Sequence, residues 1–231
     1  MKLQYLGHAA CLLEVDGAKL LFDPFLSGNE KCNVAPADVQ CDYILLTHAH
    51  QDHVGDAVEI ALANDAPILA NFELASYLNA KHGVKVEPVN PGGGIDLPFG
   101  RVKFTFAYHS SSTPDENGVP IYMGQPAGII VTSGKTSFYH AGDTGLFGDM
   151  KLLGDMHDIE LALLPIGDRF TMGPDDAVKA IEFLRPRYVV PIHYNTFPGM
   201  IDQDPEAFAD KATSATGVAV SILECGDAVE F

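Results

Sequence analysis

A short histidine-rich segment constrains this chain more than any other part of its sequence. Residues 47–53 read Thr-His-Ala-His-Gln-Asp-His, which places three imidazoles and one carboxylate within six positions. The apolar run at residues 43–46 has the composition of a buried strand and leads directly into this segment. A helical stretch at residues 56–62 follows Gly55. Because a strand-to-helix junction projects side chains into a crevice outside the strand ends, the sequence predicts a ligand site here, and these side chains favour a metal.

Strand and helix patterns alternate along the rest of the chain. Three strands open it as an antiparallel meander, with a hairpin turn at Asp16 and Gly17. The three strands of the meander are expected at residues 2–6, 10–15 and 19–22. Further strands are expected at 67–70, 84–89, 100–107, 127–132, 135–139, 160–164, 188–192 and 218–223. Helices are expected at 72–81, 146–153, 173–184 and 204–213. Residues 110–126 form the longest irregular stretch, of a kind that is functional or disordered in a compact domain. This order predicts an α+β chain with helices covering two sheets, built as a single domain over residues 1–231.

The charge balance narrows the class of partner. The chain has 14 Lys and Arg against 31 Asp and Glu, which gives a net charge of −17. Non-specific binding of nucleic acid needs a basic surface, so we expect neither nucleic acid nor an anionic membrane as a partner, and instead a small-molecule substrate. No apolar run approaches the roughly 20 residues that span a bilayer. The oligomeric state stays open, and a homo-oligomer is one of the alternatives.

The cysteines indicate the compartment. They lie far apart in the sequence, at Cys11, Cys32, Cys41 and Cys225. No two of them form a Cys-x-x-Cys motif, so their spacing supports neither a cysteine zinc site nor a disulfide framework. Met1 and Lys2 run straight into a strand, without the pattern of a signal peptide. Free thiols without a leader favour a cytoplasmic protein.

Three more residues of metal-binding type each stand just beyond the end of a predicted strand. They are His109, Asp143 and His193. If these strand ends share one edge of the structure, these side chains converge with those of residues 47–53. Seven such groups exceed what one tetrahedral zinc ion needs. Two divalent ions about 3.5–4 Å apart would use them all; we expect zinc, with manganese or iron as alternatives.

The same residues resemble those of a known family. Residues 47–53 are similar to the HxHxDH signature of the metallo-β-lactamase superfamily, and His109, Asp143 and His193 follow in that family's order of third histidine, bridging aspartate and last histidine. Asp23 resembles the aspartate that braces the histidine segment in the family. Residues 5–8, 23–25, 140–147 and 193–198 are similar to an uncharacterised branch of cytosolic metal-dependent hydrolases related to the ascorbate-6-phosphate lactonases.

The resemblance implies a four-layer αββα sandwich with two metal ions at one edge. It assigns His48, His50 and His109 to the first ion. It assigns Asp52, His53 and His193 to the second, with Asp143 bridging the two. The ions would activate a bridging hydroxide, one of them would polarise the electrophilic oxygen of the substrate, and Asp52 or Asp143 would orient the nucleophile.

Several other residues are candidates for the site. Substrate contacts are predicted from Arg169, which could instead pair with a neighbouring acid, and from Tyr194, Asn195 and Thr196, which follow a predicted ligand directly. His8 is interpreted either as lining the cleft or as structural, and His140 as a buried residue behind the ligands. The serines at 110–112 are interpreted as a polar loop beside a ligand, with phosphate binding as the alternative.

The leading hypothesis is a metal-dependent hydrolase acting on a small ester, lactone or phosphoester. Oxygen-reducing diiron members of the fold carry Glu at the position of His50 and an attached flavodoxin domain, so this chain resembles the hydrolases instead. One alternative is a ribonuclease of the tRNA-processing branch, which shares the ligands but is disfavoured by the net charge of −17. Another is a non-catalytic ligand-binding member of the fold, which is expected to have lost metal ligands. The sequence identifies neither the substrate nor the metal.

Overall fold

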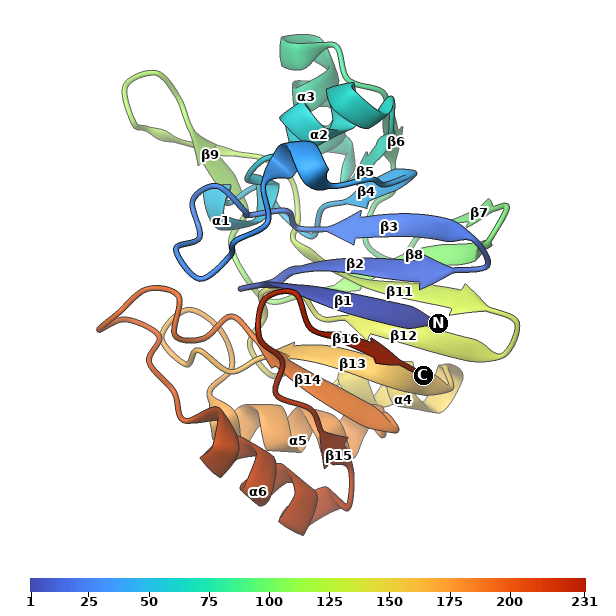
Figure 1. The fold of residues 1–231 in the computed structure, drawn as a ribbon, viewed down its shortest axis with the longest axis vertical. Coiled ribbons are helices and arrows are strands. Elements are labelled where there is room, and N and C mark those ends of the chain that lie inside the picture. Colours follow the sequence, from blue (N-terminus) through green and yellow to red (C-terminus); the bar gives the residue numbers. More distant parts are fainter.

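Two seven-stranded sheets form the body of the computed structural model, which describes residues 1–231 (Figure 1). The strands of the first sheet are β1 (Lys2–Gly7), β2 (Ala10–Val15), β3 (Ala18–Phe22), β4 (Tyr43–Leu45), β5 (Ile68–Ala70), β6 (Val86–Pro88) and β16 (Ala228–Glu230). Those of the second are β7 (Gly94–Leu97), β8 (Gly100–Phe106), β11 (Ala127–Ser133), β12 (Thr136–His140), β13 (Ile159–Pro165), β14 (Tyr188–Ile192) and β15 (Ala219–Val220). The spatial orders are β16-β1-β2-β3-β4-β5-β6 and β15-β14-β13-β12-β11-β8-β7.

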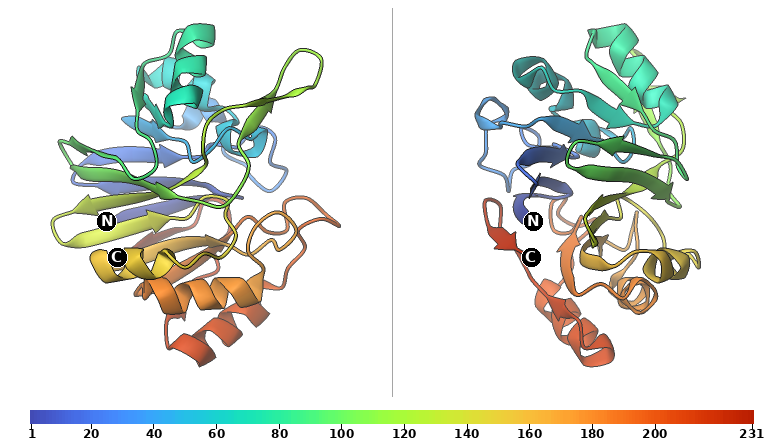
Figure 2. Two further views of the ribbon diagram at one scale, coloured as in Figure 1. Left: turned by 180° about the vertical axis from the view of Figure 1, so that it is seen from behind. Right: turned by 90° about the vertical axis from the view of Figure 1, so that its right-hand side faces the viewer.

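Helices cover the outer faces of both sheets. They are α1 (Gln51–Val54), α2 (Ala57–Asn64), α3 (Phe72–His82), α4 (Met150–Met156), α5 (Pro174–Leu184), α6 (Pro205–Thr216) and the short 3₁₀ helix η1 (Pro36–Asp38). The pair α2 and α3 lies at one end of the molecule and the pair α5 and α6 at the other (Figures 1 and 2). No helix has both the length and the apolar character of a membrane span.

Three apolar clusters define the layers. A central cluster of 22 buried residues takes side chains from both sheets, among them Leu13 of β2 and Leu163 of β13. A second cluster joins the first sheet to α2 and α3, and a third joins the second sheet to α4, α5 and α6. Alternation along strands explains this division, because Leu21 of β3 belongs to the helix side while its neighbours Leu20 and Phe22 face the other sheet. The predicted αββα sandwich is confirmed.

Local sequence signals set the helix ends close to where they were predicted. The Asp204 side chain accepts hydrogen bonds from the backbone N–H groups of Glu206 and Ala207 at 3.1 Å each, which starts α6 at Pro205. The Asn71 side chain accepts from Leu74 N at 2.9 Å and starts α3. Gly83 ends α3 with a φ of 72°, a left-handed conformation that glycine adopts without steric cost.

Some predicted elements differ from the structure. The long strand expected at residues 218–223 is reduced to β15, because the chain leaves the edge of the second sheet and crosses to the first, where Asp227 O accepts from Tyr5 N at 2.9 Å and β16 begins. Residues 110–126 are not wholly irregular: β9 (Ser112–Pro114) and β10 (Pro120–Tyr122) form a hairpin that projects from the body (Figure 2). Strand β7 is an element that the sequence did not predict, and it starts in the glycine-rich segment after the strand expected at residues 84–89.

The loops that carry the candidate residues gather on one side of the molecule. Helix α1 and the loops that follow β3, β13 and β14 all lie on the left in Figure 1. Each of these loops leaves the same end of the sandwich, so residues far apart in the sequence come together there. The histidine-rich segment at residues 47–53 includes the first three of the four residues of α1, and the cap that follows this helix is Gly55, with a φ of 40°.

Candidate metal centre

Asp23 braces the histidine segment from behind, as the sequence predicted. The carboxylate is fully buried, and its Oδ1 accepts from Thr47 N at 2.8 Å. Its Oδ2 accepts from the Thr47 hydroxyl at 2.6 Å and from His53 Nδ1 at 2.7 Å. Since His53 Nδ1 must carry the hydrogen to donate to a carboxylate, the lone pair of a neutral His53 lies on Nε2, which faces the site.

The same network sets the tautomer of His48. The Thr47 hydroxyl donates its only hydrogen to Asp23, so it acts as the acceptor in its 3.0 Å contact with His48 Nδ1. His48 therefore donates from Nδ1 and presents the lone pair of Nε2. One buried carboxylate thus orients the metal-facing nitrogen of two histidines.

The first group of candidate ligands, called here the three-histidine cluster, consists of His48, His50 and His109. Its facing atoms are His48 Nε2 and His50 Nδ1, 2.9 Å apart, and His109 Nε2, 3.3 Å from His50 Nδ1. Three ring nitrogens at these separations have the spacing of ligands that share one ion. His50 is steadied by Ser110, whose Oγ lies 3.3 Å from His50 Nε2.

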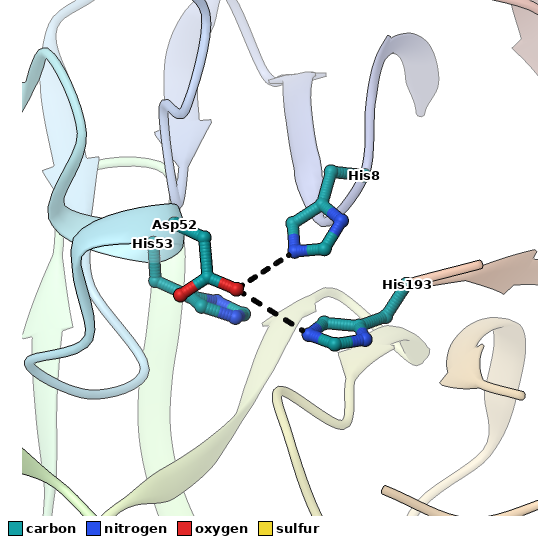
Figure 3. Close-up of side chains that lie close together, drawn as sticks. All are labelled: His8, Asp52, His53 and His193. Atoms are coloured by element: carbon teal, nitrogen blue, oxygen red, sulfur yellow. Dashed lines mark hydrogen bonds and ion pairs between the residues drawn. The ribbon is translucent and has the colours of Figure 1, made fainter. Parts of the chain in front are cut away.

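The second group, called here the acid-containing cluster, consists of His8, Asp52, His53 and His193 (Figure 3). Asp52 Oδ2 lies 3.2 Å from His8 Nε2 and 3.6 Å from His193 Nε2. One ligand atom from each of the four residues lies within 4.8 Å of every other. This cluster contains the three residues predicted for a second ion and adds His8.

Asp143 lies between the two clusters. Its Oδ1 is 3.3 Å from His53 Nε2, and its Oδ2 is 3.0 Å from His193 Nε2 and 3.4 Å from His109 Nε2. The carboxylate therefore faces ligand atoms of both clusters, which is the placement expected of a bridging ligand. The structure brings together all seven residues that the sequence proposed as metal ligands.

Several buried polar atoms of the site have no hydrogen-bond partner and are suited to bind cations. His53 Nε2, Asp143 Oδ1 and both ring nitrogens of His193 are buried and make no aligned hydrogen bond. Buried polar atoms are normally partnered, so the three of them that lie close together, His53 Nε2, Asp143 Oδ1 and His193 Nε2, call for an explanation. Neutral imidazoles and carboxylates are the ligands that zinc, manganese and iron accept, so the donor set fits divalent ions.

The two clusters differ in how they hold protons. Burial lowers the pKa of His48, His50 and His109, so the three-histidine cluster is neutral at neutral pH. Burial works in the same direction on His53 and His193, but the neighbouring carboxylates outweigh it. Asp143 and Asp23 raise the pKa of His53 well above its ordinary value, and Asp143 with Asp52 raises that of His193 to about 9.

The carboxylates show the other side of the same interactions. Burial works to raise the pKa of Asp52, but the neighbouring imidazoles of His193 and His8 bring that pKa below its ordinary range. The pKa of Asp143 is also lowered: burial works to raise it, but the charges of His193 and His53 outweigh burial. Both carboxylates are therefore anionic at neutral pH, and the acid-containing cluster holds its positive charge as protons.

The sequence left the role of His8 open between lining the cleft and a structural role. It is buried, its ring centroid lies 4.1 Å from that of His193, and burial lowers its pKa to about 4. His8 Nδ1 lies 3.0 Å from the Thr196 hydroxyl. A single histidine in a turn has no neighbouring ligand at a diagnostic spacing, so only the fold reveals that it meets Asp52.

The four predicted substrate contacts have different surroundings. Asn195 has both side-chain atoms occupied by Gln203, donating to its O at 2.9 Å and accepting from its N at 2.7 Å. Thr196 contacts His8, and Tyr194 is half-buried, with a pKa raised to about 12 by burial and nearby glutamates. Arg169 is exposed, forms no ion pair or hydrogen bond with either cluster, and has its guanidinium 5.6 Å from the Phe170 ring centroid.

His140 has the buried role that the sequence favoured. Its Nε2 donates to Ala9 O at 2.8 Å, and its Nδ1 accepts from Gly142 N at 3.0 Å. Because both ring nitrogens are occupied, His140 holds the turn that carries Asp143 and has no free atom for proton transfer. Ser111 is buried and its Oγ accepts from Ala49 N at 3.2 Å, which makes it part of the support of the histidine segment.

A cavity of about 760 Å³ adjoins the three-histidine cluster. Phe106, Tyr108, His109 and Tyr122 line it, together with Asp149, and no Lys or Arg does. Phe106, Tyr108 and Tyr122 are each about half exposed or more. The cavity therefore offers aromatic surface beside a predicted metal ligand.

Comparisons with known proteins agree with this geometry. A family model described as the beta-lactamase superfamily domain matches residues 18–194. A UPF0173 metal-dependent hydrolase of Bacillus cytotoxicus is 52% identical over 230 residues, which cover 99% of this chain and 99% of that protein. The structure of Igni18, a metallo hydrolase from Ignicoccus hospitalis, has a TM-score of 0.90 and 37% identity, covering 100% of this chain and 98% of its own.

A more distant structure shares the fold alone. The isothiocyanate hydrolase from Delia radicum gut bacteria has a TM-score of 0.79 and 21% identity, covering 100% of this chain and 99% of its own. The relation to ascorbate-6-phosphate lactonases stays a prediction. From the matched family model and the full-length relatives, the chain belongs to the β-lactamase superfamily and is a metal-dependent hydrolase.

Proposed function

We propose that this protein hydrolyses a small ester, lactone or phosphoester with two divalent ions, one in each cluster. The proposal rests on the position of Asp143, whose two oxygens face ligand atoms of both clusters at 3.0–3.4 Å. Zinc is the expected metal, with manganese and iron as alternatives. Bound there, the pair of ions would supply a water of lowered pKa as nucleophile and polarise the oxygen under attack.

The chain's own residues prepare this chemistry. Asp143 and Asp52 are anionic and offset the charge of the ions, and either carboxylate can accept a hydrogen bond from the attacking water and so orient it. Asp23 keeps the rings of His48 and His53 turned toward the site through buried hydrogen bonds. His140 fixes the turn before Asp143. This support preorganises the site, which is where such catalysis derives most of its advantage.

Within that class, an uncharged substrate is favoured over a phosphorylated one. The cavity beside His109 has aromatic walls and one acid, Asp149, but no cation to hold a phosphate. Arg169 forms no ion pair with the carboxylates of the site, and its guanidinium lies 5.6 Å from the Phe170 ring centroid. A net charge of −17 further repels an anionic substrate. An aromatic or apolar ester or lactone therefore suits the site best, as a free small-molecule partner of the protein.

A hydrolysis screen combined with elemental analysis tests the proposal. Purified protein would be stripped with a chelator, reloaded with zinc, manganese or iron, and offered aryl esters, lactones, thioesters, phosphodiesters and unstructured RNA. We expect two ions per chain and turnover of an uncharged ester or lactone that the chelator abolishes. Tyr108→Ser should raise the KM for an aryl ester more than for a small alkyl ester. Tyr77→Ser, which truncates a half-buried tyrosine of α3 that does not line the cavity, is the control. Cleavage of RNA but of no ester would overturn the proposal.

A further inference from the structure

We infer that His8 is a positioning residue of the acid-containing cluster, which fixes the carboxylate of Asp52 for the second ion. The inference rests on the proposed two-ion function. Figure 3 shows the His8 ring above Asp52, with Asp52 Oδ2 between His8 and His193. His8 Nε2 lies 3.2 Å from that oxygen, and the His8 side chain is fully buried.

The hydrogen-bond partners define what the His8 ring does. An ionised carboxylate only accepts hydrogen bonds, so His8 Nε2 must donate to Asp52 Oδ2. In the neutral ring Nδ1 is then an acceptor, and it takes the hydrogen of the Thr196 hydroxyl at 3.0 Å. The other acceptor for that hydroxyl, Tyr194 O, is farther away at 3.3 Å. Thr196 thus sets the tautomer of His8, and His8 sets the orientation of Asp52.

The backbone at His8 gives a separate reason to assign it a functional role. His8 and Ala9 form the two-residue turn between β1 and β2, and His8 has a φ of 55°. Turns of this kind favour glycine or asparagine at a left-handed first position. His8 O also accepts from His193 N at 2.9 Å, which fixes the turn against the loop of another ligand. A buried histidine at a position that glycine would fill with less strain indicates that its ring is needed.

The test measures ion binding rather than turnover. Wild type, His8→Ala, His8→Gln, Thr196→Val and Thr196→Ser would be titrated with Zn²⁺ against a chelating dye, and each would be loaded with Co²⁺ for absorption spectra. We expect His8→Ala to weaken the second ion about 10- to 100-fold and leave the first within about twofold. His8→Gln, whose amide can donate to Asp52, and Thr196→Ser should recover most of the loss. Thr196→Val should lie in between, with a melting temperature near that of wild type.

Three results would overturn the inference. One is a second-ion affinity in His8→Ala within about twofold of wild type. Another is a Co²⁺ spectrum of the saturated variant that shows a lost ligand, which would make His8 a ligand and not a positioning residue. The third is a wild-type protein that binds no second ion, which also removes the two-ion function. Two bound ions without hydrolysis of any substrate would instead contradict the proposed function alone.

Two cysteines that are far apart in the sequence, Cys32 and Cys225, meet in the structure. The Sγ atoms of Cys32 and Cys225 lie 3.3 Å apart although 193 positions separate them, and both thiols are half-buried and free. The geometry points to an oxidisable pair that closes to a disulfide. The sulfur atoms need to approach by about 1.2 Å to reach the bond length of ~2.05 Å. The pair lies beside Gly7, the last residue of β1 before His8, because a Cβ on Gly7 would be 3.9 Å from Cys32 Cβ.

The chemical step needs a named oxidant, and hydrogen peroxide suffices. One thiol of the pair attacks peroxide, forming a sulfenic acid and releasing one water. The other thiol then attacks that sulfur and displaces the second water as the sulfur–sulfur bond forms. Overall the two thiols lose two hydrogen atoms and two electrons, and peroxide is reduced to two waters. Cys11 and Cys41 are buried elsewhere and stay reduced.

Mass spectrometry of the intact protein tests this pair. After brief peroxide treatment we expect a mass lower by two hydrogen atoms, two thiols per chain instead of four on alkylation in denaturant, and reversal by dithiothreitol. The melting temperature of the oxidised protein should rise by several degrees, because the bond closes a long loop. Cys32→Ser and Cys225→Ser should show no such loss of hydrogen. Addition of oxygen atoms to both sulfurs, a disulfide between two chains, or four remaining thiols would each overturn the inference.

Discussion

The three-histidine cluster and the acid-containing cluster lie on either side of Asp143, yet they are built on different electrostatic principles. The first contains only imidazoles, each with a pKa lowered by burial. In the second, Asp52 and Asp143 keep His53 and His193 protonated to higher pH. A cation entering the first cluster meets free lone pairs, whereas one entering the second must displace protons. Neighbouring sites that share a ligand can therefore differ in how readily they bind a metal ion.

Asp143→Ala removes the residue on which both clusters depend, so it should have the largest effect. We expect loss of both ions and a fall in turnover beyond the roughly 100-fold upper range of substitutions behind the ligands. Elemental analysis and a turnover assay check the result. Asp155→Ala, which removes an exposed carboxylate paired with Arg185, is the matched control and should be neutral. Full metal content with full activity in Asp143→Ala would end the bridging assignment.

His109→Ala and His193→Ala probe the two clusters separately. Each should reduce the metal content from two ions to one, since each removes a ligand from one cluster only. Native mass spectrometry at limiting metal would show the remaining ion bound at least as tightly as in the wild type, because it no longer shares the Asp143 carboxylate with a second cation. His193 has a φ of 56°, so alanine there also strains the backbone, and melting of the stripped variants must be compared. Equal and complete loss of both ions in each variant would show that the clusters are one unit.

The stability of the stripped protein should depend on pH through the acid-containing cluster. The pKa of His193 is about 9 in the folded protein against an ordinary 6.5, so the folded state holds a proton that the unfolded chain has lost. That contribution is complete below pH 6.5 and is lost as the pH rises through about 9, at a cost of about 3 kcal/mol. Urea unfolding with a chelator from pH 6 to 9.5 measures it. The zinc-loaded protein should lose much less, and a stripped protein of constant stability would contradict the charge difference between the clusters.

Asp23→Asn and Ser110→Ala compare a buried support with an exposed one. Asp23 orients a ring in each cluster, so Asn should lower the affinity for both ions by about 10-fold or more. The larger loss is expected for the second ion, because His53 contacts Asp23 directly. Ser110 contacts only His50, at 3.3 Å and near solvent, so Ala should change the first ion less than about threefold. Titration with a chelating dye measures both. A larger effect from Ser110→Ala would reverse the assigned order of support.

Spacing along the chain was sufficient to predict the seven candidate ligands. His48, His50 and His53 share one segment; His109 follows a strand with alternating apolar residues, and His193 follows a buried apolar strand. The layers were predictable in part for the same reason, since alternating strands such as β8 and the amphipathic helix α5 have clear periods. The assignment of ligands to two ions came from the family resemblance and remains to be measured.

The parts that were missed depend on contacts between distant residues. His8 meets Asp52 across 44 positions, and Cys32 meets Cys225 across 193. One missed element is local instead: Asn117 and Gly118 are a hairpin signal that the polar composition around them obscured. There Asp115 Oδ1 accepts from the N–H groups of Asn117 and Val119 at 2.8 Å each and closes the turn of the β9–β10 hairpin. Strand β16 is short and half exposed, so its pairing with β1 leaves little trace in hydrophobicity.

Each cluster takes ligands from both sheets, and this has a consequence for the lifetime of the fold. His48 and His53 follow β4 of the first sheet, whereas His109 and His193 follow β8 and β14 of the second. Bound ions would therefore join the two halves of the sandwich at its open edge, where no strand crosses between them. Separation of the sheets would then require release of metal, so the unfolding rate should follow the dissociation rate of the ions and not only the strength of the apolar core. The cell's supply of metal would set how long a folded molecule survives.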